Sequence, residues 1–439
     1  MFWEVLSLRE YNKADAYIQD VCNQIRTKRA HKAIAKEISD HIEDQKNSFI
    51  LQGQDEKTAI NNAIREMGDP VVIGEQFDKI HRPKPEKSII AVVILSIFIQ
   101  LISVNLYKMI NFELNEYLLS IAIGIIAMLG IYFVDYSRIV RYSTFIYIIL
   151  SVSDIFFEKI SIRLIGASLS YYICLMMIIA FSGVVINFKN KGYKGYAACI
   201  LLMILGMINI VRIGSIAALV IFCAGTGALL LTACIKNVFK ADRKVTIALL
   251  IGGAALFFIV ILFIFFAIHG EGDYIYERFA VAIDPYKDPN GGGYLKILVR
   301  ELLSESNFIG EAMMPERYSS HSLDNIMPSR GDFQLTYFIA KFGYIVGIAV
   351  IFITTFLILR MFISTFKQKN QQGMFISLGC SIVILIQSVF YIMANLGHMI
   401  IGTISLPLLS YGKTAFIVNM IIIGLMLCTY RNDNVLELK

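Results

Sequence analysis

The chain has 439 residues, of which 56% are hydrophobic and 17% are charged, and its formal net charge at pH 7 is +6. About a quarter of the residues of a soluble globular protein are charged, so this composition excludes a wholly soluble protein and predicts an integral membrane protein. One of the seven cysteines lies in the polar N-terminal region and six lie in or beside apolar runs, which predicts neither a disulfide framework nor a zinc site. Membrane topology accounts for the positive charge, and we expect no nucleic-acid partner.

Residues 1–85 are predicted to form a separate helical domain. They are polar, and their apolar residues recur at helical spacing, most clearly in Ile34, Ile38 and Ile42. Asp55 is placed to cap a later helix. Three or four short amphipathic helices fit this pattern. A basic, proline-containing linker at 82–87 leads to the remainder of the chain, 86–439, which is predicted to be the transmembrane domain.

About ten apolar runs of membrane length follow the linker. They lie at roughly 89–107, 118–135, 142–157, 169–187, 195–210, 213–234, 245–268, 333–360, 374–397 and 412–430. The predicted fold class is therefore an all-α polytopic membrane protein with an additional helical N-terminal domain.

The distribution of basic residues predicts the orientation in the membrane. If residues 1–88 are cytoplasmic, most loop cations face the cytoplasm. These are Arg138, Arg141, Lys189, Lys191, Lys194, Lys236, Lys240, Arg243, Lys244, Arg360, Lys367 and Lys369. The short outer loops carry Lys108, Lys159, Arg163, Arg212 and Lys413. The positive-inside rule then predicts cytoplasmic N- and C-termini and an extracytoplasmic polar loop at 269–332.

The loop at 269–332 is the strongest candidate for a functional region. Long loops rich in Gly, Pro and charge usually carry function. This one ends with Arg330, Gly331 and Asp332 directly before an apolar run. The residues alone leave two interpretations of Asp332: an acid or base at the membrane boundary, or an N-cap whose carboxylate accepts from the free N–H groups of the next helix.

A second interruption of the apolar pattern lies at 405–412, where Pro407 and Gly412 interrupt an apolar region before the last predicted helix. Irregular backbone at membrane depth is tolerated mainly where it faces protein or a water-filled cavity. The segment could therefore form part of a substrate groove or an ordinary hairpin. Gln387, Asn395 and His398 are predicted to make hydrogen bonds between helices rather than to bind a ligand.

Three segments resemble the SEDS family, which comprises the FtsW, RodA and SpoVE proteins. They are 278–285 with 288–294, 328–338 followed by Phe342 and Gly343, and 405–412 with Asn419. Residues 1–85 resemble a helical prefix domain found ahead of permease-like and SEDS-like proteins. The resemblance implies about ten transmembrane helices with one long outer loop. It also implies a peptidoglycan glycosyltransferase that polymerises lipid II during cell elongation, division or sporulation.

The resemblance also implies roles for particular residues. Asp332 would accept the proton of the acceptor sugar hydroxyl. The departing lipid pyrophosphate needs positive charge or N–H donors, for which the candidates are Arg330, Arg278, Lys341, Ser410, Tyr411 and Lys413. In a continuous span over 333–360, Lys341 would lie roughly 13 Å below Asp332 on the opposite face, since a helix rises about 1.5 Å per residue. A lysine at that depth should line the protein interior or a cavity.

The chain departs from the family pattern at several positions. Ala340 and Lys341 stand where the family has paired glutamates, and Lys413 replaces the second glycine of a Tyr-Gly-Gly motif. A diverged, non-catalytic scaffold or regulator of wall synthesis is therefore an alternative. A lipid flippase or transporter is another, for which paired inverted repeats would be expected. The implied partners are lipid II, the membrane and a single-pass penicillin-binding transpeptidase. The sequence specifies no metal site, although the pyrophosphate chemistry is compatible with a divalent cation.

Overall fold

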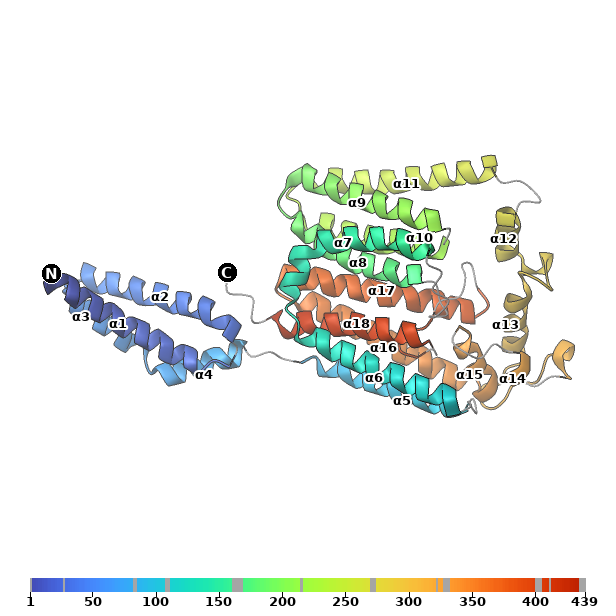
Figure 1. The fold of residues 1–439 in the computed structure, drawn as a ribbon, viewed down its shortest axis with the longest axis horizontal. Helices are drawn as coiled ribbons and strands as arrows, with labels where there is room; N and C mark the ends of the chain where they lie inside the picture. Colours follow the sequence, from blue (N-terminus) through green and yellow to red (C-terminus); the bar gives the residue numbers. More distant parts are fainter. Residues whose placement is uncertain are drawn as a thin grey trace. The chain divides into compact units, whose positions relative to one another are not determined.

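The computed structural model describes residues 2–26, 28–81, 85–106, 111–159, 169–213, 216–268, 274–320, 323–326, 332–398, 405–409 and 412–433. All regular elements of these ranges are helices (Figure 1), which confirms the predicted all-α fold class. The chain divides into two compact units. The first comprises Met1–Pro85, Gln368–Asn370 and Tyr430–Lys439, and the second comprises Glu86–Lys367 and Gln371–Thr429.

The first unit contains four helices, α1 (Phe2–Asn23), α2 (Lys28–Leu51), α3 (Glu56–Met67) and α4 (Pro70–His81). Its core includes Ile34, Ile38 and Ile42, which are buried as their helical spacing predicts. Asp55 is the N-cap of α3, where its Oδ2 accepts from the backbone N–H of Thr58 at 3.1 Å. The cap supplies one of the partners that the first turn of a helix lacks.

The second unit begins with seven long helices. These are α5 (Lys87–Leu106), α6 (Asn111–Phe133), α7 (Tyr136–Lys159), α8 (Leu169–Asn187), α9 (Gly192–Ile213), α10 (Ile216–Ile235) and α11 (Arg243–Ile268). The later long helices are α16 (Tyr344–Lys367), α17 (Gln371–Asn395) and α18 (Lys413–Arg431). Nine of the ten predicted spans therefore fall mainly on one of these long helices each.

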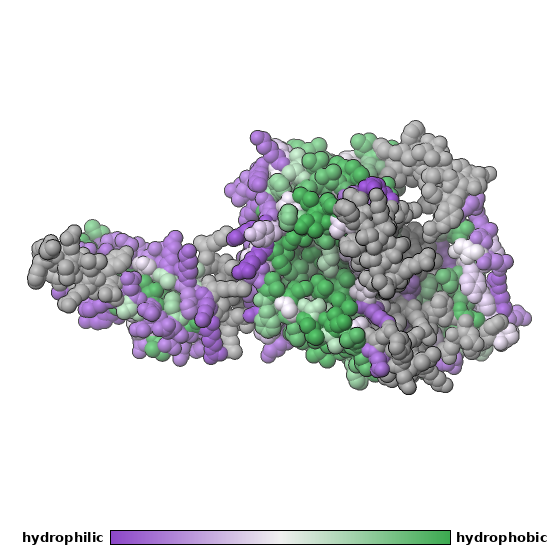
Figure 2. All heavy atoms as spheres, viewed as in Figure 1, coloured by the Kyte–Doolittle hydropathy of each residue, from purple (hydrophilic) through white to green (hydrophobic). Residues whose placement is uncertain are grey.

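Hydropathy supports a multi-pass membrane protein. Among the described residues, five helices (α9, α10, α16, α17 and α18) are long and apolar enough to cross a membrane. The pair α6 and α7 makes a sixth candidate, bent by 105°, and α5 and α8 are shorter apolar helices. Figure 2 shows a broad hydrophobic band over the helices of this unit and hydrophilic residues towards its two ends. The full count of ten crossings stays a prediction.

The predicted continuous span at 333–360 is wrong, because the structure has two helices there. The short helix α15 (Gln334–Phe342) ends at Gly343, whose φ is +95°, and α16 starts at the next residue. A loop segment, residues 307–312, binds both helix ends. Gly310 N donates to Phe342 O at 3.1 Å, and Tyr344 N donates to Asn307 O at 3.0 Å. The loop backbone thus satisfies carbonyl and N–H groups that a helix break leaves without helical partners.

Replacing Gly343 with Ala is expected to lower the stability of the second unit by about 2 kcal/mol, because a side chain at positive φ is strained. The added Cβ would also lie 2.5 Å from the carbonyl oxygen of Phe308, which is backbone. Thermal unfolding of the detergent-purified protein measures the effect. Gly310 also has a positive φ, +97°, but open space around its Cβ position, so Gly310→Ala is the matched control and should cost less. Equal losses would contradict the role of the Phe308 contact.

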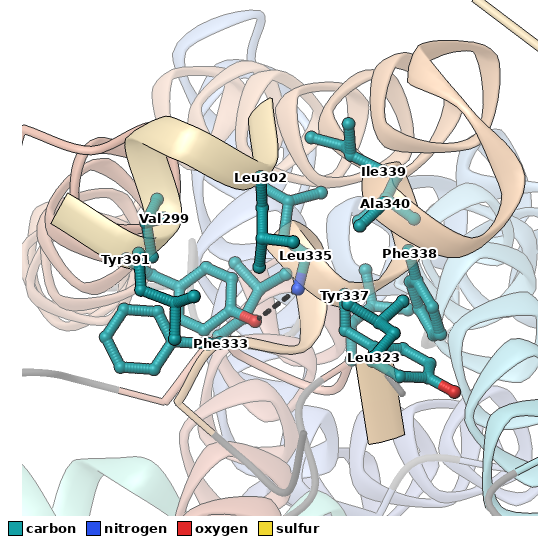
Figure 3. Close-up of a cluster of buried hydrophobic side chains, with 14 of the residues drawn as sticks. Val299, Leu302, Leu323, Phe333, Leu335, Tyr337, Phe338, Ile339, Ala340 and Tyr391 are labelled. Carbon is teal, nitrogen blue, oxygen red and sulfur yellow. Dashed lines mark hydrogen bonds between the residues drawn. The ribbon is translucent and has the colours of Figure 1, made fainter. Parts of the chain in front are cut away.

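The polar loop between α11 and α15 is itself folded. It contains α12 (Tyr274–Ile283), the 3₁₀ helix η1 (Pro285–Lys287), α13 (Tyr294–Ser304), the 3₁₀ helix η2 (Glu316–Tyr318) and α14 (Leu323–Ile326). These helices lie at one end of the bundle (Figure 1). Residues Leu298, Val299 and Leu302 of α13 share a buried core with most of α15 and with Tyr391 of α17 (Figure 3). This core fixes the loop against the segment that follows Asp332.

Candidate functional site

The N-terminal turn of α15, which follows Asp332, is held by side chains of α17. Leu335 N donates to the Tyr391 hydroxyl at 3.1 Å (Figure 3), and Thr336 N donates to Asn395 Oδ1 at 3.0 Å. The N-cap residue of α15 is Phe333, which makes no side-chain cap. The interpretation of Asp332 as the N-cap is therefore wrong. Because α17 supplies these acceptors, the Asp332 carboxylate is not needed for the N–H groups of Leu335 and Thr336.

Asn395 also holds the main chain of Asp332 itself. Its Nδ2 donates to the carbonyl oxygen of Asp332 at 2.9 Å, and Thr336 Oγ1 donates to the carbonyl oxygen of Asn395 at 2.8 Å. Asn395 is fully buried, so its amide is a costly group that has to be hydrogen-bonded. The predicted helix-to-helix bonding of Asn395 is confirmed. Its position next to Asp332 was not predicted, although Gln387, Tyr391 and Asn395 recur every fourth residue and so share one face of α17.

Two tyrosines lie near Asp332. Tyr172, near the start of α8, and Tyr391 are both close enough to the Asp332 carboxylate to feel its charge. The Tyr172 hydroxyl also lies beside the Ser405 side chain. Asp332 is partly exposed, whereas Tyr172 and Tyr391 are buried. The structure thus places polar groups of α8 and α17 near one carboxylate.

The 405–409 segment is a turn packed into protein. Leu406 and Leu409 belong to the same buried core as α13 and α15, and Leu408 has a positive φ of 64°. A non-glycine residue at positive φ is uncommon and persists where the surroundings impose it. The described part of this interruption therefore faces protein, as irregular backbone at membrane depth should.

The other predicted substrate-binding residues are placed only in part. Arg330, Ser410 and Tyr411 lie outside the described residues. Arg278 lies on α12, but its side chain is outside the described part. Lys413 is the first residue of α18 and is partly buried.

Lys341 lies on the short helix α15 and not in a continuous span over 333–360. It lies one residue before the end of α15, and its Nζ forms an ion pair of 2.8 Å with Oε1 of Glu311 in the loop between α11 and α15. The lysine side chain is 32% exposed. Because the helix breaks at Gly343, Lys341 lies beside loop residues rather than inside the long helix α16.

Arg300 and Lys296 of α13 anchor the loop between α11 and α15. Arg300 Nε donates to the carbonyl oxygen of Gly397 at 3.0 Å, just beyond α17, and Lys296 Nζ donates to the carbonyl oxygen of Ala282. Burial lowers the pKa of Lys296, and the charge of Arg300 lowers it further while Asp284 opposes the shift. No local pattern of residues predicts these anchors. They hold α13 near the Asn395 end of α17.

A cavity of about 310 Å³ lies on the loop between α11 and α15 and is lined by Glu301, Ser304, Glu305, Pro315, Glu316 and Arg317. Within the described ranges, no group of three or more His, Cys, Asp or Glu side chains could hold a metal ion.

Comparisons with known proteins identify the family. Residues 87–434 match the model of the FtsW, RodA and SpoVE cell cycle proteins. A probable peptidoglycan glycosyltransferase FtsW of Enterococcus hirae is 30% identical over 230 residues, covering 50% of this chain and 57% of the relative. The stage V sporulation protein E of Bacillus subtilis is 23% identical over 214 residues, covering 48% and 56%. The peptidoglycan glycosyltransferase MrdB of Helicobacter pylori is 33% identical over 96 residues, covering 22% and 25%. The chain thus spans at most 57% of the length of these relatives.

Solved structures share the fold. A chain from a peptidoglycan synthase complex that coordinates polymerization and crosslinking aligns with a TM-score of 0.61 at 15% identity, covering 80% of this chain and 98% of that one. A mutant of the rod shape determining protein RodA of Thermus thermophilus aligns with a TM-score of 0.52 at 11% identity, covering the same shares. The matched region includes all helices from α5 to α18 and the site around Asp332. The chain belongs to the FtsW, RodA and SpoVE family of cell cycle proteins.

Proposed function

We propose that this protein is a peptidoglycan glycosyltransferase that polymerises lipid II into glycan strands during cell elongation, division or sporulation. The observation that carries the proposal is the Asp332 carboxylate at the start of α15, with Tyr172, Tyr391 and Asn395 around it. Relatives named as peptidoglycan glycosyltransferases support the same activity.

In the proposed reaction, Asp332 takes the proton of the acceptor sugar hydroxyl as its oxygen attacks the anomeric carbon of the lipid-linked sugar. A glycosidic bond forms, the bond from the anomeric carbon to the pyrophosphate oxygen breaks, and the lipid pyrophosphate leaves with the bonding electrons. General-base catalysis of this kind contributes about 100- to 10,000-fold in rate. The clamp by Asn395 keeps the Asp332 backbone in one position, which serves the geometry that proton transfer needs.

The leaving pyrophosphate needs cations and N–H donors nearby. We propose Arg330, Arg278 and Lys413 as its cations and Ser410 and Tyr411 as hydrogen-bonding groups. Lys341 could join them only by exchanging its Glu311 partner for phosphate oxygens. A guanidinium suits this task because its planar N–H donors can bind two phosphate oxygens at once.

The basic loops support a proposed topology in the bacterial plasma membrane. Both termini and a prefix domain at residues 1–85 would be cytoplasmic, and the loop at 269–332 within the transmembrane domain at 86–439 would be extracytoplasmic. Asp332 would then meet lipid II at the outer face. A single-pass penicillin-binding transpeptidase is the proposed protein partner, which the similarity to a chain of a peptidoglycan synthase complex supports.

Purified full-length protein incubated with fluorescent lipid II tests the function, with Asp332→Ala beside the wild type and glycan products separated by gel electrophoresis. We expect polymer from the wild type and none from the variant. Equal product from both would remove Asp332 from the mechanism. No product from either would favour the non-catalytic scaffold, and lipid II translocation across vesicles without polymer would favour the flippase.

A further inference from the structure

Two loops at the end of the bundle opposite to α12 and α13 are joined through their backbones (Figure 1). The first connects α8 to α9 and the second connects α10 to α11. Asn190 N donates to Val238 O at 3.0 Å, and Gly192 N donates to Phe239 O at 2.7 Å. Phe239 is 2% exposed and packs edge-to-face against Tyr196 at 6.0 Å between ring centroids. We name these two segments, 188–194 and 236–244, the paired loops; their backbone is fixed by hydrogen bonds and a buried ring.

The paired loops present a concentrated positive charge. Their exposed basic residues are Lys189, Lys191, Lys194, Lys236, Lys240, Arg243 and Lys244. Asp242 is the single acid in these two segments of the sequence. Its Oδ1 accepts from the backbone N–H groups of Lys244 and Val245 at 2.8 and 3.2 Å, so it caps α11. The local charge is therefore strongly positive and set on a defined backbone.

The position of the paired loops favours lipid over a soluble acidic ligand. They join the end of α8 to the start of α9 and the end of α10 to the start of α11, and all four are apolar helices of the second unit. On α9, the half-exposed ring of Tyr193 and the charge of Lys194 precede an exposed apolar face that includes Leu201, Leu205 and Ile208. In a membrane, a cationic rim that continues into an exposed apolar surface would lie at the depth of the phospholipid phosphates.

We propose that the paired loops form a binding site for the headgroups of anionic phospholipids. Clusters of four to eight Lys or Arg beside transmembrane helices attract anionic lipid, and each cation strengthens binding about 5-fold. The hydrogen-bonded backbone keeps these seven cations together beside the helix ends.

Native mass spectrometry of the full-length protein, titrated with phosphatidylglycerol or with phosphatidylcholine, tests the site. The variant Lys189→Gln, Lys194→Gln, Lys240→Gln should bind phosphatidylglycerol on the order of 100-fold more weakly, with unchanged weak binding of phosphatidylcholine. Arginine at the same three positions should preserve binding, which separates charge loss from misfolding.

Exposed lysines of α2 provide the matched control, Lys28→Gln, Lys32→Gln, Lys36→Gln, which removes the same net charge and should leave lipid binding unchanged. The proposal is overturned if the first glutamine variant binds phosphatidylglycerol like the wild type, or if the control loses as much. Displacement of the lipid by millimolar inorganic phosphate would also overturn it, because the site would then select a small anion rather than lipid.

Discussion

Replacing Asp332 with Asn is expected to lower the initial rate of lipid II polymerisation by about 100- to 10,000-fold, the usual contribution of a general base. The amide is nearly isosteric with the carboxylate but cannot accept a proton at neutral pH. The bond between Asn395 and residue 332 uses a backbone oxygen, so it survives the substitution. Initial rates with fluorescent lipid II measure the loss, and an unchanged thermal transition shows that the fold is intact.

A second carboxylate serves as the control for this substitution. Asp242 is exposed and caps α11 at the other end of the bundle, so Asp242→Asn should leave the polymerisation rate within about 3-fold of the wild type. A rate for Asp332→Asn that stays as close to the wild type would exclude Asp332 as the base. The two variants differ in position but make the same chemical change, so their comparison isolates the location of the lost charge.

Hydrophobic patterning was enough to predict most of the fold. Long apolar runs have to become helices in a membrane, since each helix satisfies its own backbone groups, and nine of the ten predicted runs fall mainly on one helix each. The break at Gly343 was missed because residues 333–360 are apolar throughout apart from a few positions. What ends α15 is a positive φ together with a loop segment about 35 residues upstream that binds both helix ends. Such a partner cannot be recognised from local periodicity.

The site was predictable only where function is tied to a local pattern. Asp332 could be singled out because it stands between a polar loop and an apolar helix. The cap on that helix could not be assigned from sequence, since Asp at this place fits an N-cap as well. The N–H groups in the first turn of α15 donate to side chains far away in the sequence. Tyr391 accepts from Leu335, 56 residues before it, and Asn395 accepts from Thr336, 59 residues before it. Tertiary packing, rather than local propensity, therefore decides which side chains accept hydrogen bonds from the first turn of α15.

Replacing Asn395 with Ala is expected to reduce the turnover rate of polymerisation about 100-fold with little change in the KM for lipid II. Asn395 is a positioning residue in this argument: it holds the Asp332 carbonyl and the Thr336 N–H, and a displacement of a reacting group by about 1 Å can cost that much in rate. Steady-state kinetics on the purified variant separates the turnover rate from KM.

The control for Asn395 is another buried amide on the same face of α17. Gln387 Nε2 donates to Asn419 Oδ1 at 3.2 Å and makes its contact with α18 rather than α15. Gln387→Ala should lower the thermal transition by a similar amount, because each variant loses a buried hydrogen-bonded group, yet retain turnover. If both variants lose turnover in proportion to stability, Asn395 acts through folding alone.

In the double variant Asp332→Asn, Asn395→Ala, the second substitution should cause no further loss of turnover, because Asn395 has no effect on the rate once the base that it positions is absent.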